Sequence, residues 1–219
     1  MILLRDYQNL ILITFFWETY NGRMAMLATD DFFVCQECGY AMDGPETSNP
    51  FVPHHTKEHF TSYGAKCKCQ NLERFSLGYT FETDVIRIRV DKSVSRIEEA
   101  YSVLQAFILS ACSILNIDNN EIAGCLQYYK DGCYSFILYD TTPGGAGHVR
   151  RLNDETDLRA MLNSAFDRVN NCTCGEGNGD TSCYGCLRTY QNQKHHDIIK
   201  RRYVIDFLKD RRSEKASCK

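Results

Sequence analysis

Four cysteines in the C-terminal third constrain the fold of this chain more than any other feature. Their spacing is Cys172-x-Cys174-x8-Cys183-x2-Cys186, and the segment between the two pairs is rich in Gly, Asn and Asp. Such a turn can bring two close pairs of sulfur atoms onto one ion, which is what a tetrahedral zinc site requires. Four thiolates fill the coordination shell and leave no position for a catalytic water, so the spacing predicts a structural zinc site. Two disulfides or incidental core thiols are the alternative.

A second cysteine cluster lies nearer the N-terminus. A Cys-x2-Cys knuckle is followed 29 residues later by a Cys-x-Cys pair, beyond a loop that holds three of the four prolines. The candidate ligands of a second structural zinc are Cys35, Cys38, Cys67 and Cys69. Since imidazole is an ordinary zinc ligand, one of three nearby histidines could replace a cysteine: His54, His55 or His59. The alternative is a lobe with reduced thiols and solvent-facing histidines.

Cysteine usage and hydropathy indicate the compartment. Twelve cysteines in 219 residues are many, but the chain is too long for a small secreted disulfide scaffold. No secretory signal pattern opens the sequence. The most apolar run, residues 10–17, is too short to span a bilayer, and Glu18 closes it. We therefore expect a protein of the reducing cytoplasm with no membrane partner.

Hydrophobic periodicity predicts interleaved strands and helices. Alternation and turn residues predict strands at 83–90, 122–129 and 134–139. Helical spacing predicts helices near 95–115, 156–169 and 197–211. The order of these elements favours an α/β or α+β domain, a mixed sheet with flanking helices that one or two cysteine zinc sites staple together. We expect three parts: an unassigned N-terminal segment at 1–30, a zinc-knuckle lobe at 31–80, and an α/β core with the C-terminal zinc site and a basic helix at 81–219.

A glycine-rich turn, Tyr139–His148, follows the last predicted strand. Backbone N–H groups in such a turn can bind an anion such as a phosphate, so the candidate anion-binding residues are Gly144, Gly145, Gly147 and His148. A tight turn that needs glycine for close packing is the alternative. The sequence contains no Walker A loop and no dinucleotide fingerprint, and we expect no enzymatic activity from this chain by itself. The rival function is a phosphate-ester hydrolase that uses this turn with Asp84 and Asp140.

Positive charge is concentrated at the C-terminal end. Residues 188–219 contain ten Lys or Arg against four Asp or Glu and carry +6, whereas the whole chain carries −3. Tyrosines and histidines are interleaved with these cations, a composition that suits a phosphate backbone with occasional base stacking. The candidate nucleic-acid contacts are Arg188, Lys200, Arg201 and Arg202. A solvated helix face is the alternative.

The order of these motifs resembles the MZB family, the zinc-binding domain named after mitomycin repair factor A. The resemblance covers roughly residues 30–210. The motifs behind it are Cys35–Gly39, Thr83–Val85, Tyr139–Gly147 and the four cysteines up to Leu187, followed by Asn192, His196 and Arg201 or Arg202. In this family the domain stands at the C-terminus of DEAD/DEAH-type helicases, and related subunits occur in phage-defence systems of the DISARM type.

The resemblance implies a zinc-stabilised module that works with a superfamily 2 helicase on DNA, in DNA repair or phage defence. It also implies the zinc ligands, which would be Cys172, Cys174, Cys183 and Cys186. We expect no helicase motor within this chain, so the helicase would be joined to it in cis or act in trans. A pure protein-interaction adaptor is the remaining alternative.

Overall fold

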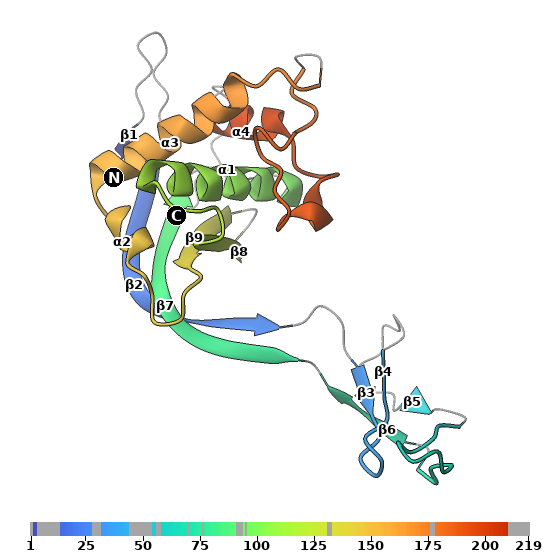
Figure 1. Ribbon diagram of the computed structural model, residues 1–219. Coiled ribbons are helices and arrows are strands. Elements are labelled where there is room, and N and C mark those ends of the chain that lie inside the picture. The colour runs from blue at the N-terminus through green and yellow to red at the C-terminus, as the bar shows by residue number, and fades with distance from the viewer. Residues whose placement is uncertain are drawn as a thin grey trace. The chain divides into compact units, whose positions relative to one another are not determined.

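The computed structural model of the chain describes residues 2–3, 14–27, 32–43, 54–55, 58–69, 71–75, 77–90, 94, 96–130, 133–175 and 178–209 (Figure 1). The chain divides into two units. Unit 1 comprises Met1–Gly22 and Glu82–Lys219, and unit 2 comprises Arg23–Phe81. Both boundaries lie inside long strands, β2 (Thr14–Leu27) and β7 (Gly78–Val90). The division into parts at 1–30, 31–80 and 81–219 stays a prediction.

The larger sheet has five strands in the order β1-β2-β7-β9-β8. Its further strands are β1 (Ile2–Leu3), β8 (Ile122–Lys130) and β9 (Cys133–Asp140). Strand β9 is buried along nearly its whole length, since β7 and β8 pair with its two edges and a helix covers one face. The strand pair predicted from sequence is confirmed as β8 and β9. The turn residues 131–132 lie outside the described residues.

Helix α1 (Ile97–Leu115) covers this sheet and contacts β8 and β9 (Figure 1). Helices α3 (Glu155–Asn170) and α4 (Arg201–Leu208) pack on α1 and on each other. Three rings join the helices to the sheet: Phe107 lies 5.2 Å from Phe136 and 6.5 Å from Phe207, between ring centroids. Within the described residues α1 is long and apolar enough to cross a bilayer, but most of it is buried in this core. Such burial is what the core helix of a globular domain shows.

The start of α4 differs from the sequence prediction. We predicted a helix from 197 to 211, whereas the chain forms a short 3-10 turn, η1 (Gln193–His195), and α4 begins only at Arg201. The N–H groups of Arg201 and Arg202 donate to the carbonyls of Thr181 and Gly179, at 3.1 and 2.9 Å. The loop at 172–186, which carries the four C-terminal cysteines and is called the cysteine loop below, therefore supplies acceptors for the first amides of the helix. This contact between distant segments fixes where the helix begins.

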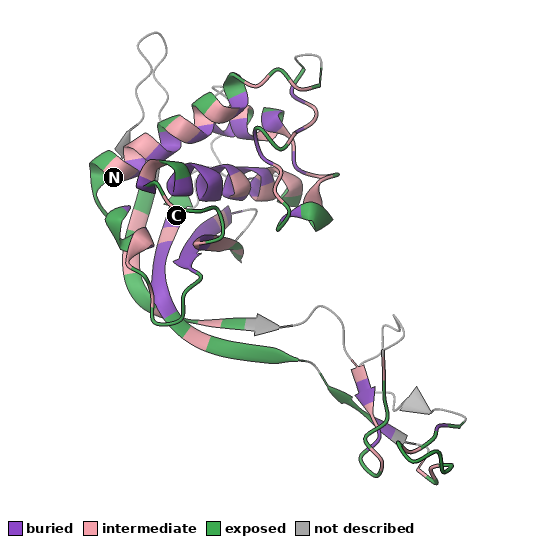
Figure 2. Cartoon of the chain, viewed as in Figure 1, coloured by how far each residue is buried: buried purple, intermediate pink, exposed green. Residues whose placement is uncertain are grey.

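Unit 2 contains a small sheet in the order β4-β3-β6-β5. Its strands are β3 (Phe32–Val34), β4 (Ala41–Asp43), β5 (His54–His55) and β6 (Asn71–Phe75). Among its described residues, the buried hydrophobic cluster consists of Phe33, Cys35 and Leu72. Figure 2 shows the contrast with the helices of unit 1, where buried residues are dense. The proline-containing loop is predicted at 43–56, and residues 44–53 of it lie outside the described residues.

The fold class predicted from sequence is confirmed as α+β. Among the residues that the structure describes, every strand pairing with a defined register is antiparallel. Segregation of helices to one face of an antiparallel sheet is the usual α+β arrangement.

Candidate metal centres

The four C-terminal cysteines lie around one point. Cys172 and Cys174 follow the end of α3, and Cys183 and Cys186 lie in a tight turn before α4. All four sulfur atoms are within 4.8 Å of one another. The Sγ atoms of Cys172 and Cys183 are 3.6 Å apart, and those of Cys174 and Cys186 are 3.9 Å apart. A tetrahedral zinc with Zn–S bonds of about 2.3 Å has S–S edges of about 3.8 Å, whereas a disulfide has about 2 Å. The donor set therefore fits zinc.

Backbone hydrogen bonds shape the turn that carries the second cysteine pair. The N–H groups of Cys186, Leu187 and Arg188 all donate to the carbonyl of Cys183, at 2.9 to 3.1 Å. The N–H of Cys183 points at the Sγ of Cys186, 3.1 Å away. Such N–H donors support the negative charge of thiolate ligands. These hydrogen bonds thus bring the sulfurs of Cys183 and Cys186 to the same side of the turn.

The pKa values of these thiols show why the site favours a cation. Burial alone would raise the pKa of Cys183, but the backbone N–H of Gly185 and neighbouring thiols outweigh this effect and lower it to about 7. Burial raises the pKa of Cys174, and burial also raises that of Cys186. One thiolate thus forms readily, while further ionisation at the same place is opposed. A divalent cation would stabilise the remaining thiolates, which is the chemistry that a structural zinc supplies.

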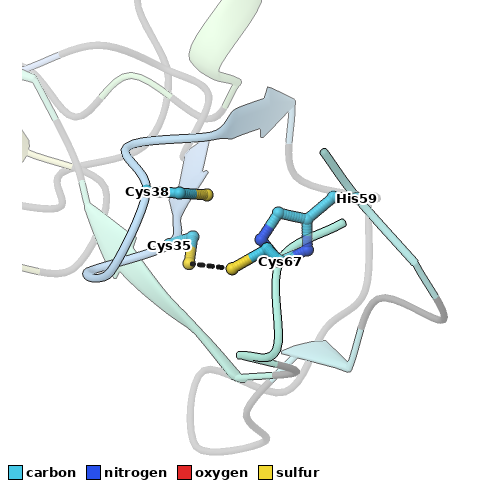
Figure 3. A group of neighbouring side chains, drawn as sticks. All are labelled: Cys35, Cys38, His59 and Cys67. Carbon is cyan, nitrogen blue, oxygen red and sulfur yellow. Dashed lines mark hydrogen bonds between the residues drawn. The ribbon is translucent and has the colours of Figure 1, made fainter. Parts of the chain in front are cut away.

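A second donor set lies in unit 2 and consists of Cys35, Cys38, His59 and Cys67 (Figure 3). Its four ligand atoms are also within 4.8 Å of one another, and the Sγ atoms of Cys35 and Cys67 are 3.8 Å apart. The sequence named Cys69 as the fourth ligand, with a histidine as the alternative. Cys69 is not among these four residues; like Cys38 and Cys67, it packs against the small core of Phe33 and Leu72.

The knuckle that carries Cys35 and Cys38 is a backbone turn. The N–H of Gly39 donates to the carbonyl of Cys35, and the N–H of Cys35 donates to the carbonyl of Tyr40. Burial would raise the pKa of Cys35, but the backbone N–H groups of Cys38 and Glu37 outweigh it and lower the value to about 6. This turn therefore prepares a thiolate, as the first pair of a zinc knuckle should.

Two of the four predicted nucleic-acid contacts, Arg188 and Arg201, form hydrogen bonds that hold the cysteine loop, which is also the C-terminal metal loop, in place. Arg201 is only 3 % exposed, and its guanidinium donates to the carbonyls of Val169 and Cys174, at 2.9 and 2.6 Å. Arg188 donates to the hydroxyl of Ser182 and to the carbonyl of His196. Both side chains thus tie the cysteine loop to its surroundings, a structural use that the charge pattern alone did not reveal.

The other two predicted contacts are not fully buried: Lys200 is half-buried and Arg202 is exposed. Arg202 is exposed and forms a surface ion pair with Asp180, at 2.9 Å. The ammonium of Lys200 lies 5.7 Å from the centre of the Tyr203 ring. A surface ion pair contributes little to stability, so Arg202 remains available to another anion.

The cysteine loop is also anchored to α1, which sequence reasoning missed. Asn192 is buried, and its Nδ2 donates to Gln105 Oε1 at 3.0 Å and to the carbonyl of Leu187 at 2.8 Å. Its Oδ1 accepts from the N–H of Thr189 and lies 2.9 Å from Nε2 of His196. Nothing in the spacing of Gln105 and Asn192 predicts this pair, because 87 residues separate them.

The glycine-rich turn binds an anion that belongs to the protein itself. The carboxylate of Asp140, which is fully buried, accepts hydrogen bonds from the N–H groups of Ala146, His148 and Val149, at 2.8 to 3.0 Å. It thereby caps the short helix α2 (His148–Arg151). The N–H groups of Gly144 and Gly145 donate to the carbonyls of Glu82 and Thr142. Anion binding by Gly144, Gly145, Gly147 and His148 stays a prediction, but most of the amides that it needs already have acceptors.

Asp84, the other carboxylate of the rival hydrolase, is buried and forms an ion pair with Arg150, at 2.6 Å. It lies directly against Gly145, which has a φ of 82°: a Cβ on Gly145 would come within 2.5 Å of Asp84 Oδ2 and 3.0 Å of its backbone nitrogen. The close approach explains why glycine stands at this position.

Replacing Gly145 by alanine is therefore expected to destabilise unit 1 by about 3 kcal/mol, from the positive φ and the contact with Asp84 together. Gly147→Ala is the matched control, because Gly147 has a φ of 80° with no heavy atom within 4 Å of the added Cβ. That control is expected to lose only about 1 kcal/mol. Thermal unfolding measures both, and equal melting temperatures for the two variants would contradict the packing argument.

The α+β fold and the two tetrahedral donor sets define a zinc-binding protein, with Zn²⁺ as the cofactor that both sets suit. Residues 103–187, which contain all four C-terminal cysteines and the glycine-rich turn, match the family model described as "MZB: MrfA Zn-binding domain". The resemblance predicted from its motifs is thus confirmed for this segment.

One solved structure, "Crystal Structure of DUF1998 helicase MrfA bound to DNA", is similar over 89 % of this chain, with 12 % sequence identity and a TM-score of 0.46. The aligned region is 25 % of that helicase, so this chain spans about a quarter of its length. No curated protein matches the chain.

Proposed function

We propose that the chain is a zinc-binding accessory module of a superfamily 2 DNA helicase, which contributes DNA or protein contacts in DNA repair or phage defence. The observation that carries the proposal is the four-cysteine site within the segment that matches the MrfA Zn-binding domain. Four sulfur donors leave no open position, so the metal acts as a structural staple and not as a catalyst. The helicase would be joined in cis or act in trans, in the reducing cytoplasm.

The surface beside the C-terminal metal loop supports contact with nucleic acid. Tyr184 and Tyr190 are 68 % and 82 % exposed, and such aromatic faces suit stacking with unpaired bases. Lys200 and Arg202 lie at the start of α4, which the same loop positions. A DNA phosphate could replace Asp180 as the partner of Arg202 at little cost, because the present ion pair is exposed.

The test is fluorescence anisotropy of zinc-loaded protein with labelled single-stranded and double-stranded DNA over a series of salt concentrations. We expect the double variant Lys200→Ala, Arg202→Ala to bind roughly tenfold more weakly and to lower the salt slope by about two, one for each lost phosphate contact. Arg159→Ala is the matched control, because Arg159 is a surface cation on α3, ion-paired with Glu155. Equal affinity of the double variant and the control would contradict DNA contact at this surface.

The two rival functions predict other outcomes. No DNA affinity at low salt, together with retention of a helicase at high salt, would make the chain a protein-interaction adaptor. Cleavage of a phosphodiester that Asp84→Ala and Asp140→Ala abolish in folded protein would make it a hydrolase. The buried positions of both carboxylates and their bonds within the protein favour a structural role instead.

A further inference from the structure

We propose that unit 2 carries a zinc site of the Cys3His type, with Cys35, Cys38, His59 and Cys67 as ligands, and that this metal holds unit 2 folded. The site lies outside residues 103–187, so the family match does not cover it. The inference concerns the fold of unit 2 alone and does not depend on the proposed role beside a helicase.

The backbone places His59 opposite Cys67. The N–H of Cys67 donates to the carbonyl of His59 at 3.0 Å, and Phe60 forms an isolated antiparallel bridge with Lys66. The turn between them closes through hydrogen bonds from Thr61 to Ala65 and from Gly64 to Thr61. This hairpin-like loop therefore delivers one nitrogen donor and one sulfur donor from its two ends to the same point.

The side chain of His59 is oriented as a ligand would be. It is only 3 % exposed, and its ring stacks on Tyr40, with 4.8 Å between the ring centroids. In Figure 3 the imidazole faces the sulfurs of Cys35, Cys38 and Cys67. A buried imidazole with three thiols within 4.8 Å is a complete tetrahedral donor set for zinc. Cys69 is not needed to fill the shell.

The part of unit 2 that the structure describes has little hydrophobic core of its own. Its buried cluster contains Phe33, Cys35 and Leu72, and Cys35 is itself a proposed ligand. Several other large hydrophobic side chains in the described part of the unit are exposed, among them Tyr63 and Tyr79. A segment of about sixty residues with so little burial usually needs a metal or a disulfide, because its hydrophobic burial does not offset the loss of chain entropy.

The experiment compares His59→Ala with Cys69→Ser in the full chain, by zinc content per chain and by limited proteolysis. We expect two zinc ions in the wild type and in Cys69→Ser. We expect one in His59→Ala, with new cleavage sites within residues 23–81 and none in unit 1. His59→Cys should restore the second zinc, and cobalt substitution should then report one more thiolate ligand than in the wild type.

Each contrary result overturns a part of the inference. Loss of one zinc in Cys69→Ser, with two retained in His59→Ala, would assign the fourth position to Cys69. Loss of zinc in His59→Ala without new cleavage in unit 2 would overturn the claim that the metal holds this unit folded. Two zinc ions in both variants would show that neither side chain is a ligand.

Discussion

Cys183→Ser is expected to remove one zinc ion per chain and to unfold the segment around the C-terminal metal loop. Zinc binding contributes on the order of 10 kcal/mol in zinc-finger peptides, which is comparable with the whole stability of an ordinary domain. Without the metal, the loop loses the carbonyl positions that hold the amides of Arg201 and Arg202 and the guanidinium of Arg201. Mass spectrometry gives the zinc content, and hydrogen exchange of residues 171–209 gives the local loss of structure.

Cys125→Ser is the matched control, because Cys125 is exposed on β8 and lies outside both donor sets. This variant should keep both zinc ions and the exchange protection of the wild type. If Cys183→Ser also stayed fully folded and metal-loaded, the structural role of the zinc would be wrong. Unfolding confined to the loop, with α1 and the sheet still protected, is the expected pattern, since a large apolar core supports those elements.

Asp140→Ala is expected to destabilise unit 1 by about 5 kcal/mol, because three N–H groups, one of them buried, lose their charged acceptor at once. These groups belong to Ala146, His148 and Val149, so the glycine-rich turn and the start of α2 should both become disordered. The melting temperature should fall by more than about 10 °C, given a few degrees per kcal/mol for a chain of this size.

Asp140→Asn should lose less than the alanine variant. The amide keeps one oxygen acceptor, but its NH₂ group meets at least one N–H donor of the turn. Asp118→Ala is the control, because Asp118 is an exposed carboxylate in the loop before β8. If Asp140→Ala melted like the control, the carboxylate would not hold the turn, and a role in chemistry would regain support.

Much of the fold was visible in the sequence where local chemistry decides it. The alternation of Thr83–Val90 predicted most of β7, and helical spacing predicted α1 and α3 closely. The four C-terminal cysteines predicted one donor set, because short spacings and a Gly-rich turn leave few other ways to arrange them. These features depend on neighbours in the chain, which a sequence displays directly.

The rest depended on contacts between distant segments. The basic pattern 200–202 looked uniform, yet Arg201 is buried under the metal loop while Arg202 faces solvent. Similarly, His59 and Cys69 are both reasonable ligands by composition, and only the hairpin-like loop before Cys67 brings His59 into the donor set. Charge and spacing identify which residues are able to bind a metal or an anion, whereas packing decides which of them lie together at one site or reach the surface.

The entry and exit of unit 2 have an evolutionary consequence. The chain leaves unit 1 within β2 and returns within β7, and these two strands are neighbours in one sheet. An insertion between adjacent strands leaves the strand order around it unchanged. Gain, exchange or loss of unit 2 during evolution would therefore leave the segment at 103–187, which matches the MZB model, unchanged.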